Sequence, residues 1–174
     1  MSVEGGIEIR QIEAGEWRRW REVRLRMLRD DADFFSTRYD DMVREPDATW
    51  QTWVADAAGG DQKTLFIAEE QGEWLGVVGA FARVNPLEIQ LISMWVDPSA
   101  RGRGIAQRLI RAVALWATGR GSTRVVLFVQ EANTPAQRLY ERAGFRLTGD
   151  RTPAAGGRSA FKLVLAASVG DLLE

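Results

Sequence analysis

Two residue types with strong chemistry are missing from this chain of 174 residues, which contains no cysteine and no histidine. Without cysteine there is no disulfide, no thiol nucleophile and no thiolate ligand for a metal ion. Without histidine the chain lacks the most common metal ligand and the usual general base, which excludes Ser-His-Asp catalysis and histidine-metal chemistry. Any chemistry must use carboxylates, tyrosine, backbone amides or a bound cofactor, and we expect no metal.

An excess of charge and long apolar runs are also missing. The 23 basic and 24 acidic residues give a net charge of -1, so no general basic field attracts nucleic acid. No run of about 18 apolar residues is present to cross a membrane. The first residues carry early acids where a signal peptide would have an apolar stretch. We therefore expect a cytoplasmic protein without nucleic-acid or membrane partners.

The overall composition is that of a folded domain. Hydrophobic residues make up 45% of the chain and charged residues 27%, which is enough for a core and a soluble surface. A chain of this length typically forms one domain, so we predict a single domain over residues 1–174.

Hydrophobic periodicity predicts an alternating order of strands and helices. The predicted strands are residues 7–12, 64–68, 74–84, 88–96, 124–129, 145–147 and 159–165. The predicted helices are residues 16–30, 46–59, 105–118 and 134–143. A glycine-rich turn at Gly156 and Gly157 separates the last two strands. This order indicates a mixed α/β sandwich, and neither a strict βαβ repeat nor a helical bundle.

Residues 101–106, with the sequence RGRGIA, lie between a predicted strand and a predicted helix. Glycines allow a sharp turn close to a ligand, and free amides at a helix N-terminus bind anions, so phosphate or pyrophosphate is the expected ligand. A dinucleotide-binding motif needs glycine or alanine where Gln107 stands, and no P-loop lysine-serine pair follows Gly104. On this segment alone, a turn that merely uses glycines is the alternative.

The neighbouring sequence resembles the GNAT superfamily of N-acetyltransferases. Residues 94–98 (MWVDP) lead into Arg101-x-x-Gly104-x-Ala106, which matches the superfamily's (Gln/Arg)-x-x-Gly-x-(Gly/Ala) acyl-CoA signature. Residues 133–145 (NTPAQRLYERAGF) resemble its second motif, at the expected distance. The resemblance covers about residues 64–165 and is weak before them, where these enzymes carry variable acceptor-binding helices.

The resemblance implies both a fold and a function. The fold is a mixed, mostly antiparallel central sheet of about seven strands flanked by four helices, with residues 7–60 on the acceptor side and residues 64–165 as the acetyl-CoA-binding core. The function is transfer of an acetyl group from acetyl-CoA to a primary amine of a small molecule or protein by direct attack. The lack of cysteine and histidine fits a route without a covalent enzyme intermediate. Many relatives are dimers, so a homodimer is one expected assembly.

The sequence leaves two other functions as alternatives to acetyl transfer. A non-catalytic domain that binds acyl-CoA and regulates is the alternative, because Gln90 stands where histone-type members carry a catalytic glutamate. A nucleotide-binding module is disfavoured by the spacing of the turn.

The resemblance also assigns the residues that bind acetyl-CoA. The amides of the turn hold the pyrophosphate, and the end of the preceding strand pairs with the pantetheine arm. That strand and residues 124–129 are expected to splay apart around the arm. Asn133 is expected to hydrogen-bond the pantetheine, or else only to precede the next helix. The full set is Met94, Trp95, Val96, Arg101, Gly102, Arg103, Gly104, Ile105, Ala106, Asn133 and Tyr140.

For catalysis, the resemblance places Tyr140 beside the sulfur of coenzyme A, where its phenol would protonate the departing thiolate. The alternative is that Tyr140 is an ordinary core residue. Glutamine cannot act as a base, so Glu88, two residues before Gln90 on the same face of the strand, is the candidate that deprotonates the amine through water. Glu131 is a more distant candidate.

Trp20, Arg24, Phe34 and Phe35 lie in or just after the first helix, where the family builds its acceptor pocket. Arg24 interrupts an apolar stripe, as a residue that meets an anionic group would. We favour the simpler interpretation, in which Trp20 belongs to the core and Arg24 extends to water.

Overall fold

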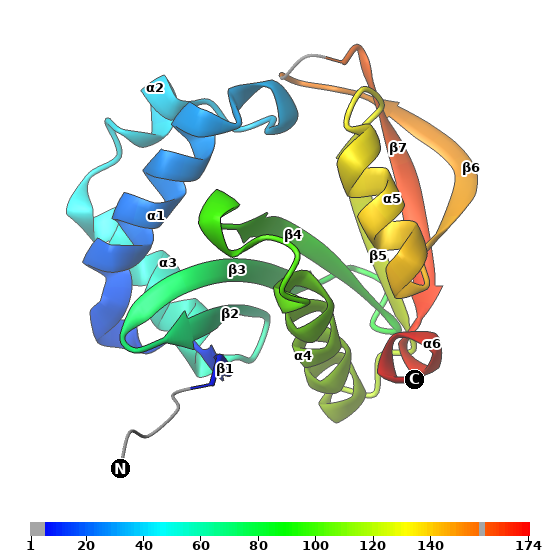
Figure 1. The fold of residues 1–174 in the computed structure, drawn as a ribbon, viewed down its shortest axis with the longest axis horizontal. Coiled ribbons are helices and arrows are strands. Elements are labelled where there is room, and N and C mark those ends of the chain that lie inside the picture. Colours follow the sequence, from blue (N-terminus) through cyan, green and yellow to red (C-terminus); the bar gives the residue numbers. More distant parts are fainter. Residues whose placement is uncertain (1–5, 157–158) are drawn as a thin grey trace.

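The computed structural model describes residues 6–156 and 159–174, which fold around one seven-stranded sheet with the order β1-β2-β3-β4-β5-β7-β6. Only β4 and β5 run parallel, and the other neighbours are antiparallel. The expected mixed, mostly antiparallel sheet is therefore confirmed (Figure 1). The strands are β1 (Glu8–Gln11), β2 (Lys63–Glu70), β3 (Glu73–Ala82), β4 (Glu88–Val96), β5 (Arg124–Gln130), β6 (Arg146–Pro153) and β7 (Phe161–Ser168).

The described residues contain six α-helices where the sequence predicted four. They are α1 (Trp17–Asp30), α2 (Tyr39–Met42), α3 (Asp47–Gly59), α4 (Ile105–Gly119), α5 (Thr134–Ala143) and α6 (Val169–Leu173), with 3₁₀ turns at Ala14–Glu16, Ala32–Phe34 and Pro98–Ala100. The two unpredicted helices, α2 and α6, have four and five residues, which is too short to show a hydrophobic period.

The last two strands also differ from the prediction. β6 extends from Arg146 to Pro153, well beyond the predicted residues 145–147, and β7 is shifted toward the C-terminus. β6 is an edge strand with mostly exposed polar residues, so its sequence shows no apolar alternation. The predicted turn at Gly156 and Gly157 lies partly outside the described residues, because Gly157 is not among them.

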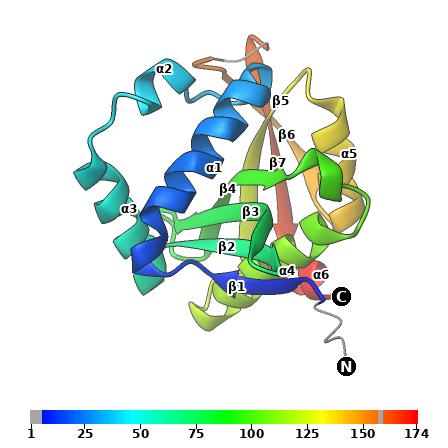
Figure 2. The ribbon, with the colours of Figure 1, turned by 60° about the vertical axis from the view of Figure 1, so that its left-hand side comes forward.

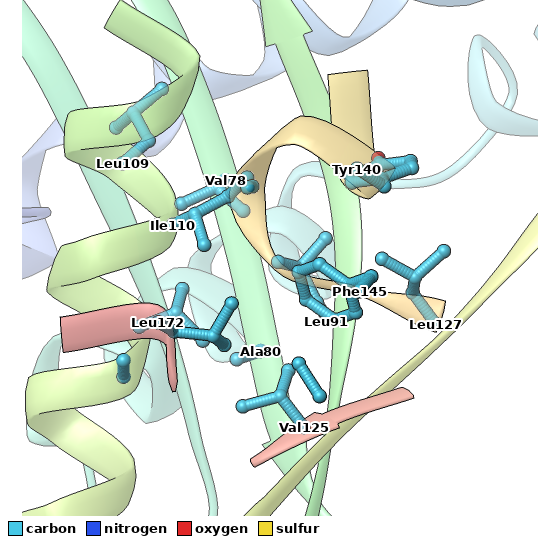
Figure 3. Close-up of a cluster of buried hydrophobic side chains, with 14 of the residues drawn as sticks. Val78, Ala80, Leu91, Leu109, Ile110, Val125, Leu127, Tyr140, Phe145 and Leu172 are labelled. Carbon is cyan, nitrogen blue, oxygen red and sulfur yellow. The ribbon is translucent and has the colours of Figure 1, made fainter. Parts of the chain in front are cut away.

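The sheet buries apolar side chains on both faces. Helices α4, α5 and α6 cover one face, where Leu91, Leu109, Tyr140 and Phe145 belong to one cluster (Figure 3). Helices α1 and α3 cover the other face of β2, β3 and β4 (Figures 1 and 2). Trp20 belongs to this second cluster and is buried, which confirms it as a core residue.

β4 changes direction part way along its length. Leu91 lies in the cluster under α4, whereas Trp95, an even number of residues later, lies in the cluster under α1. The register against β3 shifts between Val77 and Gly79, and Ser93 has a φ of 54°. A β-bulge at Ser93 therefore turns the end of β4 and reverses which face its side chains meet.

β4 and β5 pair only where both strands begin. Their register joins Glu88 to Arg124, Ile89 to Val125 and Gln90 to Val126, and it ends there. β4 continues to Val96 and β5 to Gln130 without pairing to each other, and the strands diverge (Figure 1). The predicted splay is confirmed, and it leaves one backbone edge of β4 available to a ligand.

Gly76 lets the start of α4 pack directly on β3. A Cβ atom at Gly76 would lie 3.0 Å from Ile105 Cγ2 and 3.0 Å from the Trp95 carbonyl oxygen. We expect Gly76→Ala to lower the free energy of unfolding by about 1–3 kcal/mol, because neither neighbour moves without strain. Gly59→Ala is the matched control, since a Cβ there meets no atom within 4 Å. Urea unfolding measures both, and equal stability of the two variants would contradict this packing.

Candidate active site

The turn from β4 to α4 is held in shape by Asp97. Its Oδ1 accepts hydrogen bonds from Ser99 N (2.9 Å) and Ser99 Oγ (2.7 Å), and its Oδ2 lies 2.8 Å from Arg26 Nη1. Burial raises the pKa of this carboxyl, but the bonds from Ser99 and Arg26 outweigh burial, so the pKa is lowered overall. An ionised Asp97 therefore fixes the turn and ties it to α1.

The backbone N–H groups of residues 101–107 donate to no other group within the described part of the chain. The first hydrogen bond of α4 runs from Arg108 N to the Gly104 carbonyl oxygen (3.2 Å). Consecutive free amides at the N-terminus of a helix as long as α4 attract an anion through hydrogen bonds and the helix dipole.

The two glycines of the turn leave space in front of these amides. Gly102 and Gly104 have φ values of 80° and 73°, a region that favours glycine. A Cβ atom at either glycine would meet no atom within 4 Å. The turn is therefore open on the side where a phosphate group would approach, so its residues fit a pyrophosphate.

The arginine side chains of the turn have partners of their own. Arg103 forms two hydrogen bonds to Glu70, of 2.7 and 3.0 Å. Arg101 Nε donates to the Val96 carbonyl oxygen (3.1 Å), and its Nη2 lies 3.8 Å from Asp31 Oδ2. The anion site is therefore built from backbone amides, and the arginines add positive charge around it.

Tyr140 lies on α5, on the face that packs against the sheet (Figure 3). Its ring is buried and contacts the ring of Phe145 edge-on, with centroids 5.7 Å apart. Burial raises the pKa of the hydroxyl above its ordinary value of 10. Tyr140 is thus both a core residue and a phenol that keeps its proton at neutral pH.

Asn133 is the N-cap of α5, since its Oδ1 accepts a hydrogen bond from Ala136 N (3.2 Å). The helix therefore begins at Thr134, the first residue of the predicted helix. This position follows β5, directly beyond the splayed strand ends. Capping uses the oxygen of the side chain, so the amide NH₂ is the part of Asn133 left for a ligand.

Glu88 lies at the closed end of the splay, where β4 and β5 still pair. Its Oε1 accepts a hydrogen bond from Arg124 Nη1 (2.7 Å), and its Oε2 lies 3.3 Å from Arg83 Nε. Arg83 also donates to Gln90 Oε1 (2.9 Å). Both carboxylate oxygens are engaged, so Glu88 accepts a proton only by giving up an ion pair. These contacts count against the prediction that Glu88 is the base, and they favour deprotonation of the amine by water.

Glu131, the more distant candidate, is half-exposed, and its Oε1 lies 3.9 Å from Arg151 Nη1. No group of three or more acidic side chains within the described ranges is arranged to hold a metal ion. In the same residues, no helix is both long and apolar enough to cross a membrane.

Arg24 is only half-buried, so the interpretation that its side chain extends to water holds in part. Its Nη1 atom is buried and donates to no group among residues 6–156 and 159–174. The guanidinium lies over the ring of Phe35, 5.2 Å from its centroid. Arg24 lies one helical turn from Trp20 and from Leu28, which are buried residues of α1, but it is itself only half-buried.

Sequence reasoning missed Gln130, which is fully buried at the end of β5. Its Nε2 donates to the Gly156 carbonyl oxygen (2.6 Å), and its Oε1 accepts from Ser159 N (3.0 Å). The signal was a polar residue that ends an otherwise apolar strand. Gln130 thus links Gly156, after β6, to Ser159, before β7, beside the open end of the splay.

A comparison with protein families matches residues 17–145 to the acetyltransferase (GNAT) family. A mycothiol acetyltransferase from Thermomonospora curvata is 31% identical over 147 residues, which are 83% of this chain and 46% of that protein. Human N-acetyltransferase 8B is 35% identical over 89 residues, 49% of this chain and 39% of that protein. The chain thus spans less than half the length of these two relatives.

Solved structures share the whole fold. An acetyltransferase of the GNAT family from Streptococcus pneumoniae has a TM-score of 0.79 at 20% identity, covering 94% of this chain and 99% of its own. An acetyltransferase from Salmonella typhimurium, solved with acetyl-CoA, has a TM-score of 0.76 at 16% identity and covers 94% of both chains. At these identities the likeness concerns the fold.

Proposed function

Because the chain belongs to the acetyltransferase (GNAT) family, we propose that it transfers an acetyl group from acetyl-CoA to a primary amine of a small molecule or protein. One observation carries the proposal: the free amides of residues 101–107 lie at the end of β4, next to the opening between β4 and β5. An anion site beside an unpaired strand edge suits a ligand with a pyrophosphate and an amide-containing arm, as coenzyme A has.

In this proposal the amides of residues 101–106 hold the pyrophosphate. The unpaired backbone edge at Met94, Trp95 and Val96 pairs with the amides of the pantetheine arm, and the Asn133 NH₂ donates to the same arm. The bulge at Ser93 turns the end of β4 toward the opening, where a backbone amide is able to bind the thioester oxygen as it gains negative charge.

Acetyl-CoA supplies the activated acetyl group. The amine nitrogen bonds to the carbonyl carbon, the carbon–sulfur bond breaks, and the departing thiolate takes a proton from the Tyr140 hydroxyl. The acceptor nitrogen loses its proton to water or to a carboxylate. Burial raises the pKa of Tyr140, so the phenol stays protonated until the thiolate forms, although the same shift makes it a weaker acid.

The experiment that tests the function measures free thiol released from acetyl-CoA in the presence of a panel of primary amines. We expect amine-dependent thiol release with an equal amount of N-acetylated product, identified by mass spectrometry. Tight coenzyme A binding without amine-dependent release across small-molecule and peptide amines would favour the non-catalytic alternative. Cytoplasmic location and a homodimer stay predictions.

The role of Glu88 has its own test. We expect Glu88→Gln to keep the pH dependence of kcat/KM, because the ion pairs with Arg83 and Arg124 occupy both oxygens and leave deprotonation to water. Glu73→Gln is the matched control, since its side chain is 83% exposed. A loss of kcat/KM that is largest at low pH, in Glu88→Gln alone, would instead establish Glu88 as the base.

A further inference from the structure

Arg24 is a half-buried cation that forms no ion pair with the described residues. Its buried Nη1 has no hydrogen-bond partner in the described part of the chain. Asp30, at the end of α1, pairs with other arginines: it lies 3.6 Å from Arg26 Nε and 3.0 Å from Arg29 Nε. Burial lowers the pKa of the Arg24 guanidinium to about 10. An unpaired buried charge is unfavourable, so a group that pairs with it on binding would gain free energy.

Helix α1 and the segment that follows it reach both sides of the open end of the splay. On the β4 side, Arg26 lies 2.8 Å from Asp97, and Asp31 lies 3.8 Å from Arg101 in the anion-binding turn. On the other side, the segment after α1 meets the residues that follow β6, where a Cβ at Gly156 would lie 2.9 Å from the Ser36 carbonyl oxygen. Arg24 therefore lies on α1, which together with the segment after it contacts both sides of the opening.

Other polar side chains near this region also have buried atoms without a hydrogen-bond partner in the described residues. Ser36 Oγ and Arg21 Nε are also buried without a hydrogen-bond partner among the described residues. Leu127 and Val129 point toward α5, so the alternation of β5 directs Gln130 to the face on which α1 lies. Lys162 is opposite Gln130 on β7 and adds a second cation to that face. The unpaired donors at this end of the opening thus come from cationic and hydroxyl side chains.

We propose that the acceptor amine carries an anionic group, a carboxylate or a phosphate, which pairs with Arg24. This inference rests on the proposed acetyl transfer and names its substrate class. A guanidinium with a free N–H edge binds such a group through paired hydrogen bonds. The amine end of the acceptor then lies toward the thioester in the opening between β4 and β5, while the anionic end lies under α1.

The test uses matched acceptors that differ only in the anionic group. L-Alanine and L-phenylalanine are compared with their amides, and phosphoethanolamine with ethanolamine, with kcat/KM calculated for the neutral amine. We expect the anionic member of at least one pair to be favoured at least tenfold. The carboxylate and phosphate pairs distinguish the two anions. Equal or lower kcat/KM for the anionic member of every pair would overturn the proposal.

Arg24→Met is then compared with Arg29→Met, whose side chain is 65% exposed and bonded to the adjacent Asp30. We expect Arg24→Met to abolish the preference for the anionic member and Arg29→Met to keep it. We also expect a higher unfolding midpoint in Arg24→Met, because an unpaired buried charge is removed. A preference that survives in a folded Arg24→Met variant would overturn the proposal.

A binding measurement separates this inference from the proposed function. The unfolding midpoint of the protein saturated with coenzyme A is recorded with each acceptor. We expect the anionic acceptors to raise it in the wild type and not in Arg24→Met. If coenzyme A does not bind, the proposed function fails. If coenzyme A binds and the neutral members are acetylated, but the anionic members neither raise the midpoint nor are favoured, the inference about Arg24 fails alone.

Discussion

Gly104→Glu is expected to weaken coenzyme A binding by more than tenfold, which corresponds to at least about 1.4 kcal/mol. Gly104 is the N-cap of α4 and has a φ of 73°, so a side chain there strains the turn that presents the amides. The new carboxylate would also enter the open space before those amides and repel the pyrophosphate. Isothermal titration calorimetry with coenzyme A measures the loss.

Gly121→Glu is the matched control for this variant. Gly121 also has a positive φ (75°) and open space around it, but it lies after the other end of α4. Gly121→Glu introduces the same backbone strain and the same charge, but away from the turn. We therefore expect it to leave the coenzyme A affinity unchanged. Equal affinity of wild type, Gly104→Glu and Gly121→Glu would show that the turn does not bind the pyrophosphate.

Tyr140→Phe is expected to lower kcat by about 10–100-fold, because it removes a placed proton donor that water replaces only in part. The ring and its contact with Phe145 stay, so stability and coenzyme A affinity should change little. Thiol-release kinetics under conditions where chemistry limits turnover measure the effect. An unchanged kcat would show that Tyr140 serves only in packing, a role that its burial also supports.

The pH dependence gives a second test of Tyr140. Burial raises its pKa above 10, so the phenol stays neutral throughout the working range of an enzyme. We expect no loss of kcat from Tyr140 ionisation below about pH 10. Because the folded state favours the neutral phenol, its contribution to stability is complete below the unfolded pKa and is lost as pH rises above it. Tyr140→Phe should lack that alkaline loss.

The sequence predicted the sheet well because its inner strands are apolar and the turns between them carry glycine or proline. It also predicted the divergence of β4 from β5, through the family resemblance. It did not reveal β6 as a long edge strand, since exposed polar residues give no period. Helices α2 and α6 were missed because one turn is too short for a pattern. The bulge at Ser93 depends on pairing with β3, which a single strand's sequence does not encode.

The sequence predicted some parts of the candidate site and missed others. The amide turn follows from local sequence, since glycine spacing and a following helix suffice to expose amides. The partners of Glu88 do not follow from local sequence, because Arg83 and Arg124 come from neighbouring parts of the sheet. Arg24 lies within an apolar stripe, and the sequence pattern fits a side chain that extends to water as well as one held inside. Only the tertiary packing of α1 decides between these states.

A crystal structure of the protein with coenzyme A tests the central claim most directly. The account predicts the pyrophosphate against the amides of residues 101–106 and the pantetheine arm between β4 and β5. It also predicts the sulfur next to the Tyr140 hydroxyl. Coenzyme A bound elsewhere, with β4 and β5 empty between their splayed ends, would contradict it.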